Sequence, residues 1–139
     1  MKNIIFLLLL LIPMTVFSQD FKFRGKSKKA ETKVYNIGED EPFEEHNEDK
    51  KVEVQFDGAQ LTIGKETFRY IWHQNSRDME TVQLNCLERV EEGNYSYINA
   101  RFELNFLDSD HLRITRYKST SPTTEARITY SVDIIKTTN

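Results

Sequence analysis

Cysteine is almost missing from this chain: Cys86 is the only one among 139 residues. A single thiol cannot close an intramolecular disulfide, so burial of apolar side chains has to hold the fold together. Cys86 follows the alternation of Val82 and Leu84, which places it on the apolar face of a predicted strand. A thiol in apolar surroundings is unreactive, so we interpret Cys86 as a core residue and not as a nucleophile.

Sequence signatures of catalysis are also missing. No serine lies in a glycine-flanked elbow, and no glycine-rich loop is present to cradle a phosphate. None of the three histidines, His46, His73 and His111, has a second ligand at a metal-binding spacing. The acidic run 39–49 lacks the alternating ligands and the turn glycine of a calcium loop. We therefore predict no catalytic residue, no metal site, no cofactor and no enzymatic activity. An unrecognised hydrolase is the third alternative.

The charge balance excludes another class of function. The chain has 19 lysine and arginine residues against 22 aspartate and glutamate residues, a net charge of −3. Nucleic-acid binding is built on clustered cations, so we predict no nucleic-acid partner. After the first eighteen residues, no apolar run approaches the roughly 20 residues that cross a bilayer. We therefore expect no membrane span in the mature chain.

The N-terminus has the pattern of a cleavable export signal. Lys2 precedes an apolar run over residues 4–12, Pro13 ends that run, and small residues stand near a cleavage position after Ser18. The run is too short for a membrane anchor. No cysteine stands near the cleavage position, so we expect no lipid anchor. These features predict a signal peptide over residues 1–18 and an exported protein, periplasmic or secreted.

Residues 19–50 carry two blocks of opposite charge. The segment 19–33 is basic and the segment 39–49 is acidic, and residues 34–37 form a possible short strand. Apolar residues are sparse in both blocks, so little burial is available to offset the entropy of ordering them. We expect a flexible or loosely docked arm. The alternative is that the two opposed blocks fold back on each other.

From Lys51 onward, apolar and polar residues alternate with a period of two. The clearest strand has Ile98, Ala100, Phe102, Leu104 and Phe106 on one face. Seven such strands, joined by tight turns, predict an all-β antiparallel meander over residues 51–136, followed by a tail at 137–139. A small barrel would hide the apolar face and leave no exposed edges, so we favour it over a β-sandwich.

Arg116 falls on the apolar face of the strand that begins at Leu112. Burying a guanidinium without a partner costs several kcal/mol, so we consider three resolutions. The strand ends or bulges there and Tyr117 takes the inward position, or Arg116 extends to the barrel rim. In the third, Arg116 meets an acidic ligand or an internal carboxylate such as Glu80 or Glu88.

Three aromatic residues share the inward parity: Tyr70, Trp72 and Tyr130. Aromatic side chains with a polar tip are ordinary core residues near a wet edge, and they also line small-molecule pockets. The functional hypothesis is a ligand-binding site formed by Tyr70, Trp72, Arg116 and Tyr130. Its ligand would be apolar or aromatic with an acidic end.

With its signal peptide, a mature length of about 120 residues and an up-and-down meander, the chain resembles a small exported lipocalin-like domain. The resemblance covers residues 51–136 and concerns architecture. The glycine-x-tryptophan signature of that family is missing near the first strand, and Trp72 stands well into the sheet. No ligand residue of the family can therefore be assigned to a position in this chain.

The resemblance implies an exported, non-enzymatic binding module for a small apolar ligand or a protein partner. The alternative is a structural or interaction protein of the cell envelope with a solid core. In that case the outward residues Tyr95, Tyr97, Asn99 and Arg101 would form the docking surface, because tyrosine and arginine are enriched at interface hot spots. The oligomeric state is not indicated by the sequence.

Overall fold

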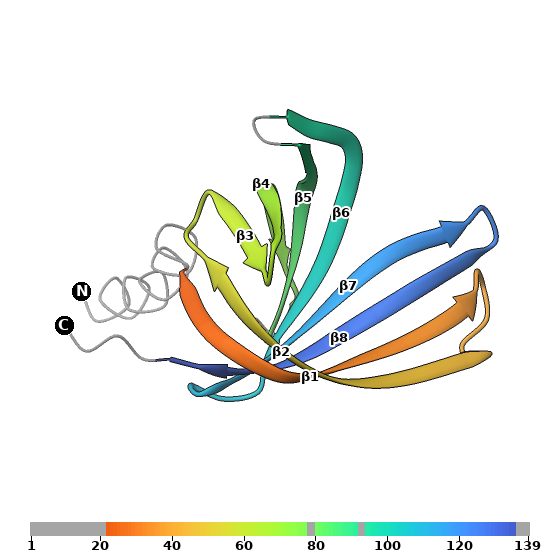
Figure 1. Ribbon diagram of the computed structural model, residues 1–139, viewed down its shortest axis with the longest axis horizontal. Coiled ribbons are helices and arrows are strands. Elements are labelled where there is room, and N and C mark those ends of the chain that lie inside the picture. The colour runs from red at the N-terminus through yellow and green to blue at the C-terminus, as the bar shows by residue number, and fades with distance from the viewer. Residues whose placement is uncertain (1–21, 78–79, 92–93, 136–139) are drawn as a thin grey trace, which may run out of the picture.

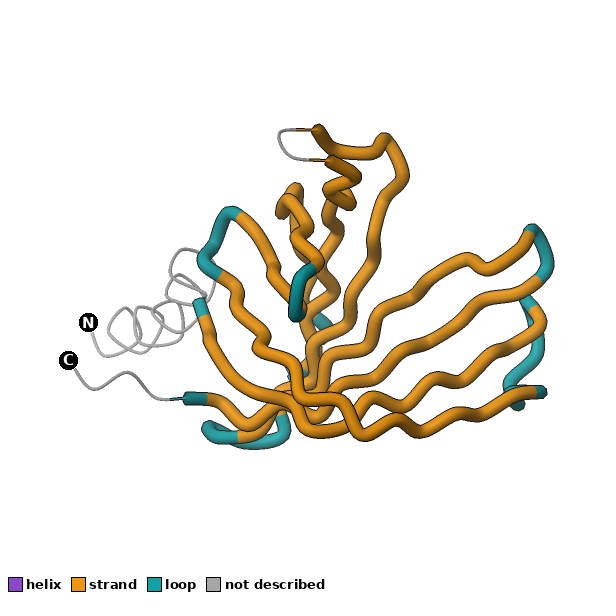
Figure 2. Tube along the Cα trace, viewed as in Figure 1, coloured by secondary structure: helices purple, strands orange, loops and turns teal. Residues whose placement is uncertain are grey.

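The computed structural model describes residues 22–77, 80–91 and 94–135. Over these residues the chain forms eight antiparallel strands and no helix (Figures 1 and 2). Each strand pairs with the next, and the last pairs with the first to close a barrel. The predicted all-β meander and its closure into a barrel are confirmed. The strands are β1 (Phe23–Asn36), β2 (Glu44–Phe56), β3 (Gln60–Ile63), β4 (Glu66–Asn75), β5 (Thr81–Glu91), β6 (Asn94–Phe106), β7 (His111–Ser121) and β8 (Thr124–Ile134).

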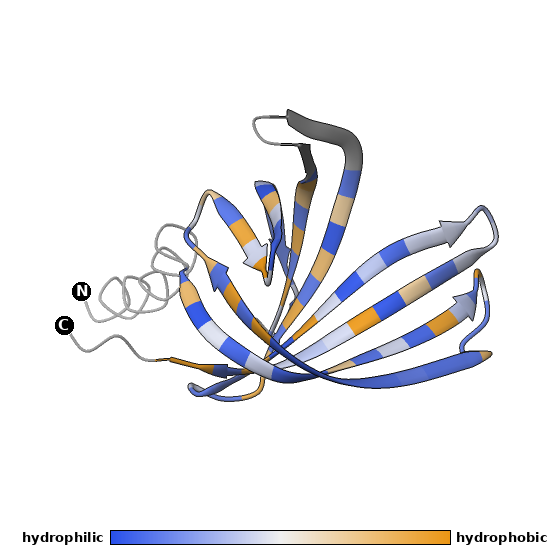
Figure 3. Cartoon of the chain, viewed as in Figure 1, coloured by the Kyte–Doolittle hydropathy of each residue, from blue (hydrophilic) through white to orange (hydrophobic). Residues whose placement is uncertain are grey.

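Side-chain alternation sets the two faces of the barrel wall. On β6, Ala100, Phe102 and Leu104 are buried inside, and Arg101 lies exposed on the outside. Figure 3 shows this alternation as bands of apolar and polar residues along the strands. The inward residues of all eight strands meet in one apolar cluster, in which the rings of Phe68 and Phe102 pack edge to face with centroids 4.8 Å apart. Burial of these side chains is the main stabilising term of the fold.

Tight turns connect the strands as the turn residues predict. Between β2 and β3, Gly58 has a φ of 92°, a left-handed conformation that glycine adopts without strain. The Asp57 carboxylate accepts hydrogen bonds from the backbone N–H groups of Ala59 and Gln60, each at 2.8 Å. These two bonds favour the ionised carboxylate and lower the pKa of Asp57 below its ordinary value.

The charged segment before residue 51 is part of the barrel, and our prediction of a flexible or loosely docked arm over residues 19–50 is wrong for its described part. β1 pairs with β8 to close the barrel, and the basic β1 pairs with the acidic β2. Lys29 lies opposite Asp49 and Lys33 lies opposite Glu45, so the two blocks do fold back on each other. The β domain therefore begins at β1, and residues 1–21, which contain the predicted signal peptide, lie outside the described part.

The strands differ in length, and the barrel is therefore uneven at one end. β3 has four residues and pairs only with residues Val54–Phe56 of β2, so the part of β2 that begins at Glu44 continues past β3. In Figure 1 the β1–β2 and β7–β8 hairpins extend together to one side, and β4, β5 and β6 rise on the other. We call the end of the barrel from which the β1–β2 and β7–β8 hairpins extend the mouth. At this end β3 does not cover the inward face.

Candidate functional site

Arg116 lies inside the barrel near the mouth. It follows the buried residues Leu112 and Ile114 on β7 and is only 6% exposed. Its Nη1 donates a hydrogen bond to Oε2 of Glu66 at 2.8 Å, and its Nη2 donates one to Oε1 of Glu88 at 3.4 Å. The guanidinium also stacks over the ring of Phe68 at 4.8 Å. Of the three resolutions, the internal carboxylate is therefore the one that the structure shows.

The partners of Arg116 were predicted in part. Glu88 on β5 binds Arg116 as predicted, but Glu80 lies exposed in the segment before β5. Glu66 has the inward parity of Phe68, but it was missed because it is the first residue of β4, and only the β3–β4 hairpin brings it over the mouth. Of the alternatives left open by the sequence, the internal carboxylate is observed, with Glu66 as a second carboxylate beside Glu88.

The electrostatics of this cluster are asymmetric. The side chain of Arg116 is 7% exposed, whereas those of Glu66 and Glu88 are 55% and 39% exposed. The cation has lost its water and depends on the two carboxylates, which remain partly hydrated. Either glutamate can therefore leave the guanidinium for water at little cost, provided that another anion replaces it.

A hollow of about 430 Å³ lies at the mouth next to this cluster. Glu66 and Tyr130 both line it, so Glu66 stands between the hollow and Arg116. Tyr130 is 7% exposed, and burial, followed by the charge of Glu66, raises the pKa of its hydroxyl. The remaining lining residues are Lys50, Lys51, Val52, Glu53, Ile63, Gly64 and Lys65.

The predicted ligand-site residues are only partly brought together. Arg116 and Tyr130 both lie at the mouth: Arg116 hydrogen-bonds to Glu66, and Tyr130 lines the same hollow as Glu66. Tyr70 also points inward, but its ring packs edge to face against Phe56 at 5.6 Å. Its hydroxyl hydrogen-bonds to Nδ1 of His73, and burial raises its pKa. Tyr70 therefore belongs to the packed part of the interior.

Trp72 lies on the outside, and its predicted inward position is wrong. A β-bulge interrupts β4: Tyr70 pairs with Cys86 and Trp72 pairs with Asn85, so Ile71 is the extra residue. The bulge reverses the parity of the strand and leaves the Trp72 side chain half exposed. The sequence gives no signal for it, because every residue from Tyr70 to Trp72 is apolar or aromatic and both registers satisfy the pattern.

The thiol of Cys86 is fully buried among the core residues of β5 and β6. Burial disfavours the thiolate and raises the pKa of Cys86 to about 12. A thiol in this state is not a nucleophile at neutral pH. The interpretation of Cys86 as a core residue is confirmed.

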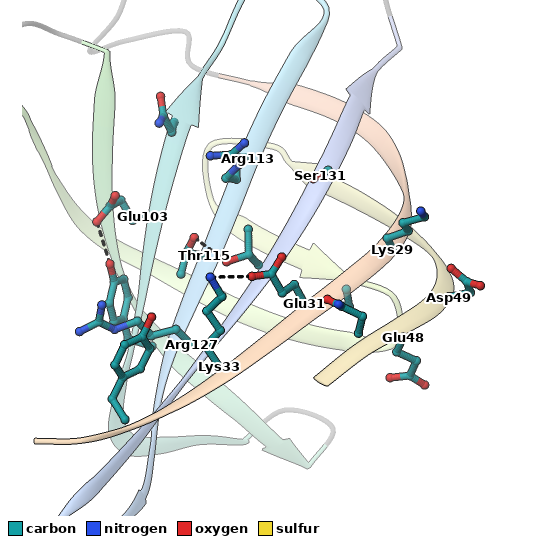
Figure 4. Close-up of a pocket in the computed structure, with 16 residues that line it drawn as sticks. Lys29, Glu31, Lys33, Glu48, Asp49, Glu103, Arg113, Thr115, Arg127 and Ser131 are labelled. Carbon is teal, nitrogen blue, oxygen red and sulfur yellow. Dashed lines mark hydrogen bonds and ion pairs between the residues drawn. The ribbon is translucent and has the colours of Figure 1, made fainter. Parts of the chain in front are cut away.

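A second hollow, of about 860 Å³, lies on the outer face of β6, β7, β8, β1 and β2; we call it the outer groove (Figure 4). Its walls are polar: Glu103 stands on one side, and Lys29 and Asp49 stand on the other. Sequence reasoning missed it, because outward polar residues indicate only a hydrated face. Its cations are Lys29, Lys33, Arg113 and Arg127. Its anions are Glu31, Glu48, Asp49 and Glu103.

Stacked arginine and tyrosine side chains fix one end of the outer groove. The Arg127 guanidinium lies 4.2 Å from the ring centre of Tyr35 and 5.4 Å from that of Tyr117. Arg101 lies over the same Tyr117 ring at 4.3 Å, and the Tyr117 hydroxyl donates to Oε2 of Glu103 at 2.9 Å. Burial is the larger cause that raises the pKa of Tyr117, and the hydrogen bond to Glu103 is the second. This end of the groove is therefore ordered before any ligand arrives.

The predicted outward docking residues are visible only in part. Asn99 and Arg101 are exposed on the outer face of β6, whereas the side chains of Tyr95 and Tyr97 lie outside the described part.

In the described ranges no cluster of three or more histidine, cysteine, aspartate or glutamate side chains is arranged to hold a metal ion. The same ranges contain no helix with the length and apolarity to span a membrane.

Comparisons with known proteins add no assignment. No protein-family model, no curated protein and no solved structure matches this chain. The closed eight-stranded antiparallel barrel is compatible with a lipocalin-like architecture.

Proposed function

We propose that the protein is an exported, lipocalin-like binding module without enzymatic activity, which holds the acidic group of a small ligand at the barrel mouth. The observation that carries this proposal is the buried Arg116 guanidinium, with the half-exposed Glu66 between it and a hollow. A buried cation whose counter-ion can turn into water favours exchange of that counter-ion for another anion.

The ligand would bind by taking the place of Glu66. Its carboxylate would accept the hydrogen bond from Nη1 of Arg116, while Glu66 turns outward toward solvent. Lys50, Lys51 and Lys65 line the hollow and would attract the anion before it reaches the guanidinium. A charge-assisted bond to a desolvated guanidinium is shorter and stronger than one between neutral groups.

The rest of the ligand would be small. Val52 and Ile63 line the hollow and offer apolar contacts for a short aliphatic or aromatic body. Below the mouth the interior is occupied by fully buried side chains, including Phe68 and Phe102. We therefore propose an aromatic or short aliphatic acid, and not a long lipid that would need the middle of the barrel.

The filled interior also favours the alternative function, an interaction protein with a solid core. In that case the outward side chains, Asn99 and Arg101 among them, would bind a protein and the mouth would bind nothing. The two functions differ in the effect of small acids. A binding module responds at Glu66 and Tyr130, and a solid interaction protein does not.

The experiment is a two-dimensional NMR titration of the full chain with a panel of aromatic and short aliphatic carboxylates. The uncharged amides of the same acids serve as matched control ligands. We expect the acids to shift the resonances of Glu66, Lys65 and Tyr130, and the amides to leave them unchanged. Acids and amides that shift these resonances equally, or not at all, would overturn the proposal.

Substitutions then test whether Arg116 binds the acidic group of the ligand. Arg116→Met should weaken acid binding by about tenfold or more, the value of one hydrogen bond to a charged group. Lys28→Ala is the control, because Lys28 is exposed on β1 and lines neither hollow. An Arg116→Met variant that keeps full affinity would show that the acids bind elsewhere.

A further inference from the structure

We propose that the outer groove is a second binding site, and that its ligand is a neutral oligosaccharide. This site is independent of the mouth, because its floor is the outward face of β7 and β8, whereas Arg116 and Tyr130 occupy the inward face. The chemistry of the lining excludes most other ligand classes.

The charges of the lining exclude strongly charged ligands. Four cations and four anions face the same hollow. A nucleic acid or another polyanion would need an excess of cations, which the groove lacks. A polycation would likewise find as many lysine and arginine side chains as carboxylates. The balanced lining therefore favours a ligand without net charge.

Lack of apolar surface excludes two further classes. Ligand pockets for lipophilic molecules are lined mainly by apolar and aromatic side chains, but Ala30 is the only aliphatic residue of this lining, and Tyr35 is covered by Arg127. The buried centres of protein–protein interfaces are depleted in lysine, glutamate and aspartate, whereas these residues make up six of the sixteen lining residues here. The backbone of the floor is already paired within the sheet, so an added strand cannot bind it.

What remains is a neutral ligand that is rich in hydrogen-bonding groups. The floor supplies the hydroxyls of Thr115 and Thr129, 3.1 Å apart, and that of Ser131. Arg113 stands beside them and makes no ion pair within the described ranges. Hydroxyls donate and accept, guanidinium groups only donate and carboxylates only accept. Sugar hydroxyls, which also do both, match this mixture.

The strand register places an exposed aromatic side chain in an outward row that begins at the edge of the groove. Trp72 lies opposite Asn85, Asn85 lies opposite Arg101, and Arg101 lies opposite Tyr117 at the edge of the groove. The amide nitrogen of Asn85 has no hydrogen-bond partner among the described residues. The bulge in β4 thus places a half-exposed indole in the same outward row as the stacked end of the groove.

This row has the extent of an extended ligand. From Trp72 on β4 to Arg127 on β8 it crosses four inter-strand spacings of about 4.8 Å, or roughly 19 Å along the surface. The flat indole offers a face against which the C–H groups of a sugar ring can pack. The polar groove beyond Tyr117 offers hydrogen bonds to the following sugars.

The experiment is an NMR titration of the full chain with neutral oligosaccharides of glucose, mannose and N-acetylglucosamine at millimolar concentration. We expect at least one series to shift the resonances of Thr115, Thr129 and Trp72 together, and longer chains to bind more tightly than the monosaccharide. No shift with any series, or shifts confined to the barrel mouth, would overturn the proposal. The carboxylate titration of the mouth is read out on other residues, so either site can fail without the other.

Two variants and a control test whether the floor hydroxyls and Trp72 bind the oligosaccharide. Thr115→Val with Thr129→Val keeps the shape of the floor and removes two hydroxyls, so affinity should fall by about fivefold or more. Trp72→Ala should abolish the gain from longer chains without changing the shifts at Thr115. Thr62→Val, on the outward face of β3, should have no effect. Full affinity in the double variant, with the melting temperature unchanged, would contradict the assignment.

Discussion

Arg116 on β7 and Glu66 at the start of β4 form a 2.8 Å ion pair across the barrel mouth, in which the cation is buried and the carboxylate is half exposed. The pair joins residues fifty positions apart in the chain. Because burial is unequal, the cost of losing the pair depends on which side chain is removed.

Arg116→Met should be less destabilising than Glu66→Gln combined with Glu88→Gln. Without Arg116, both glutamates can turn into water and methionine can pack against Phe68, so we expect a loss of about 1 kcal/mol or less. The double variant leaves the buried guanidinium without a counter-ion and should lose about 3 kcal/mol. Urea unfolding of both proteins measures the difference. The opposite order of stability would show that the buried cation does not depend on these carboxylates.

Cys86 should be protected from thiol reagents in the folded protein. It is fully buried, so a reagent cannot reach the thiol, and burial raises its pKa to about 12. The reactive thiolate is therefore not populated near neutral pH. We expect labelling only at the rate at which the chain unfolds, and rapid labelling in concentrated urea. Equally fast labelling with and without urea would contradict the packing of β5.

Gly25→Ala should destabilise the barrel where β1 meets β8. A Cβ atom at this position would lie 2.4 Å from Cγ1 of Val132 and 2.6 Å from the carbonyl oxygen of Asp133. The backbone cannot easily move aside, so we expect a loss of about 1–3 kcal/mol, measured by thermal or urea unfolding. Lys26→Ala, at the next and exposed position, is the control and should be nearly neutral. An unchanged melting temperature in Gly25→Ala would contradict the close approach of the two strands.

The β6–β7 turn should titrate as a coupled pair. The hydrogen bond and charge of Asp108 raise the pKa of His111 above 6.5. The hydrogen bond from the backbone N–H of Asp110, followed by the one from the His111 side chain, lowers the pKa of Asp108. The histidine contribution to stability is therefore complete below about pH 6.5 and is lost as the pH rises through its folded pKa. The aspartate contribution is present above the ordinary Asp pKa and is lost as the pH falls through its lowered value. NMR titration should place the midpoint of His111 above 6.5, and Asp108→Asn should lower it. A midpoint at the ordinary value in both proteins would refute the pairing.

Much of the fold was readable from the sequence wherever the barrel interior is apolar. The alternation that begins at Leu112 and Ile114 predicted the inward face of β7 and raised an inward Arg116 as one alternative, and the tight turns predicted the meander. β1 and the first half of β2 were missed, because their pairing depends on the backbone and on cross-strand charges such as Lys33 opposite Glu45 and not on apolar burial.

The candidate sites were harder to predict, because they depend on register. The bulge after Tyr70 moved Trp72 to the outside, and an apolar run gives no sign of a bulge. Glu66 reaches Arg116 only because β3 has four residues and its hairpin ends over the mouth. The outer groove requires the curvature of five strands, and Thr115 and Thr129 show no pattern that distinguishes them from any hydrated face.

The most direct test of the account is the Nε–H signal of the Arg116 guanidinium, followed by NMR during a titration with benzoate. If the mouth accepts an acidic ligand in place of Glu66, this signal should shift and saturate with benzoate and remain unchanged with benzamide. A signal that stays constant through the benzoate titration, while Glu66 remains on the guanidinium, would contradict the proposed binding site.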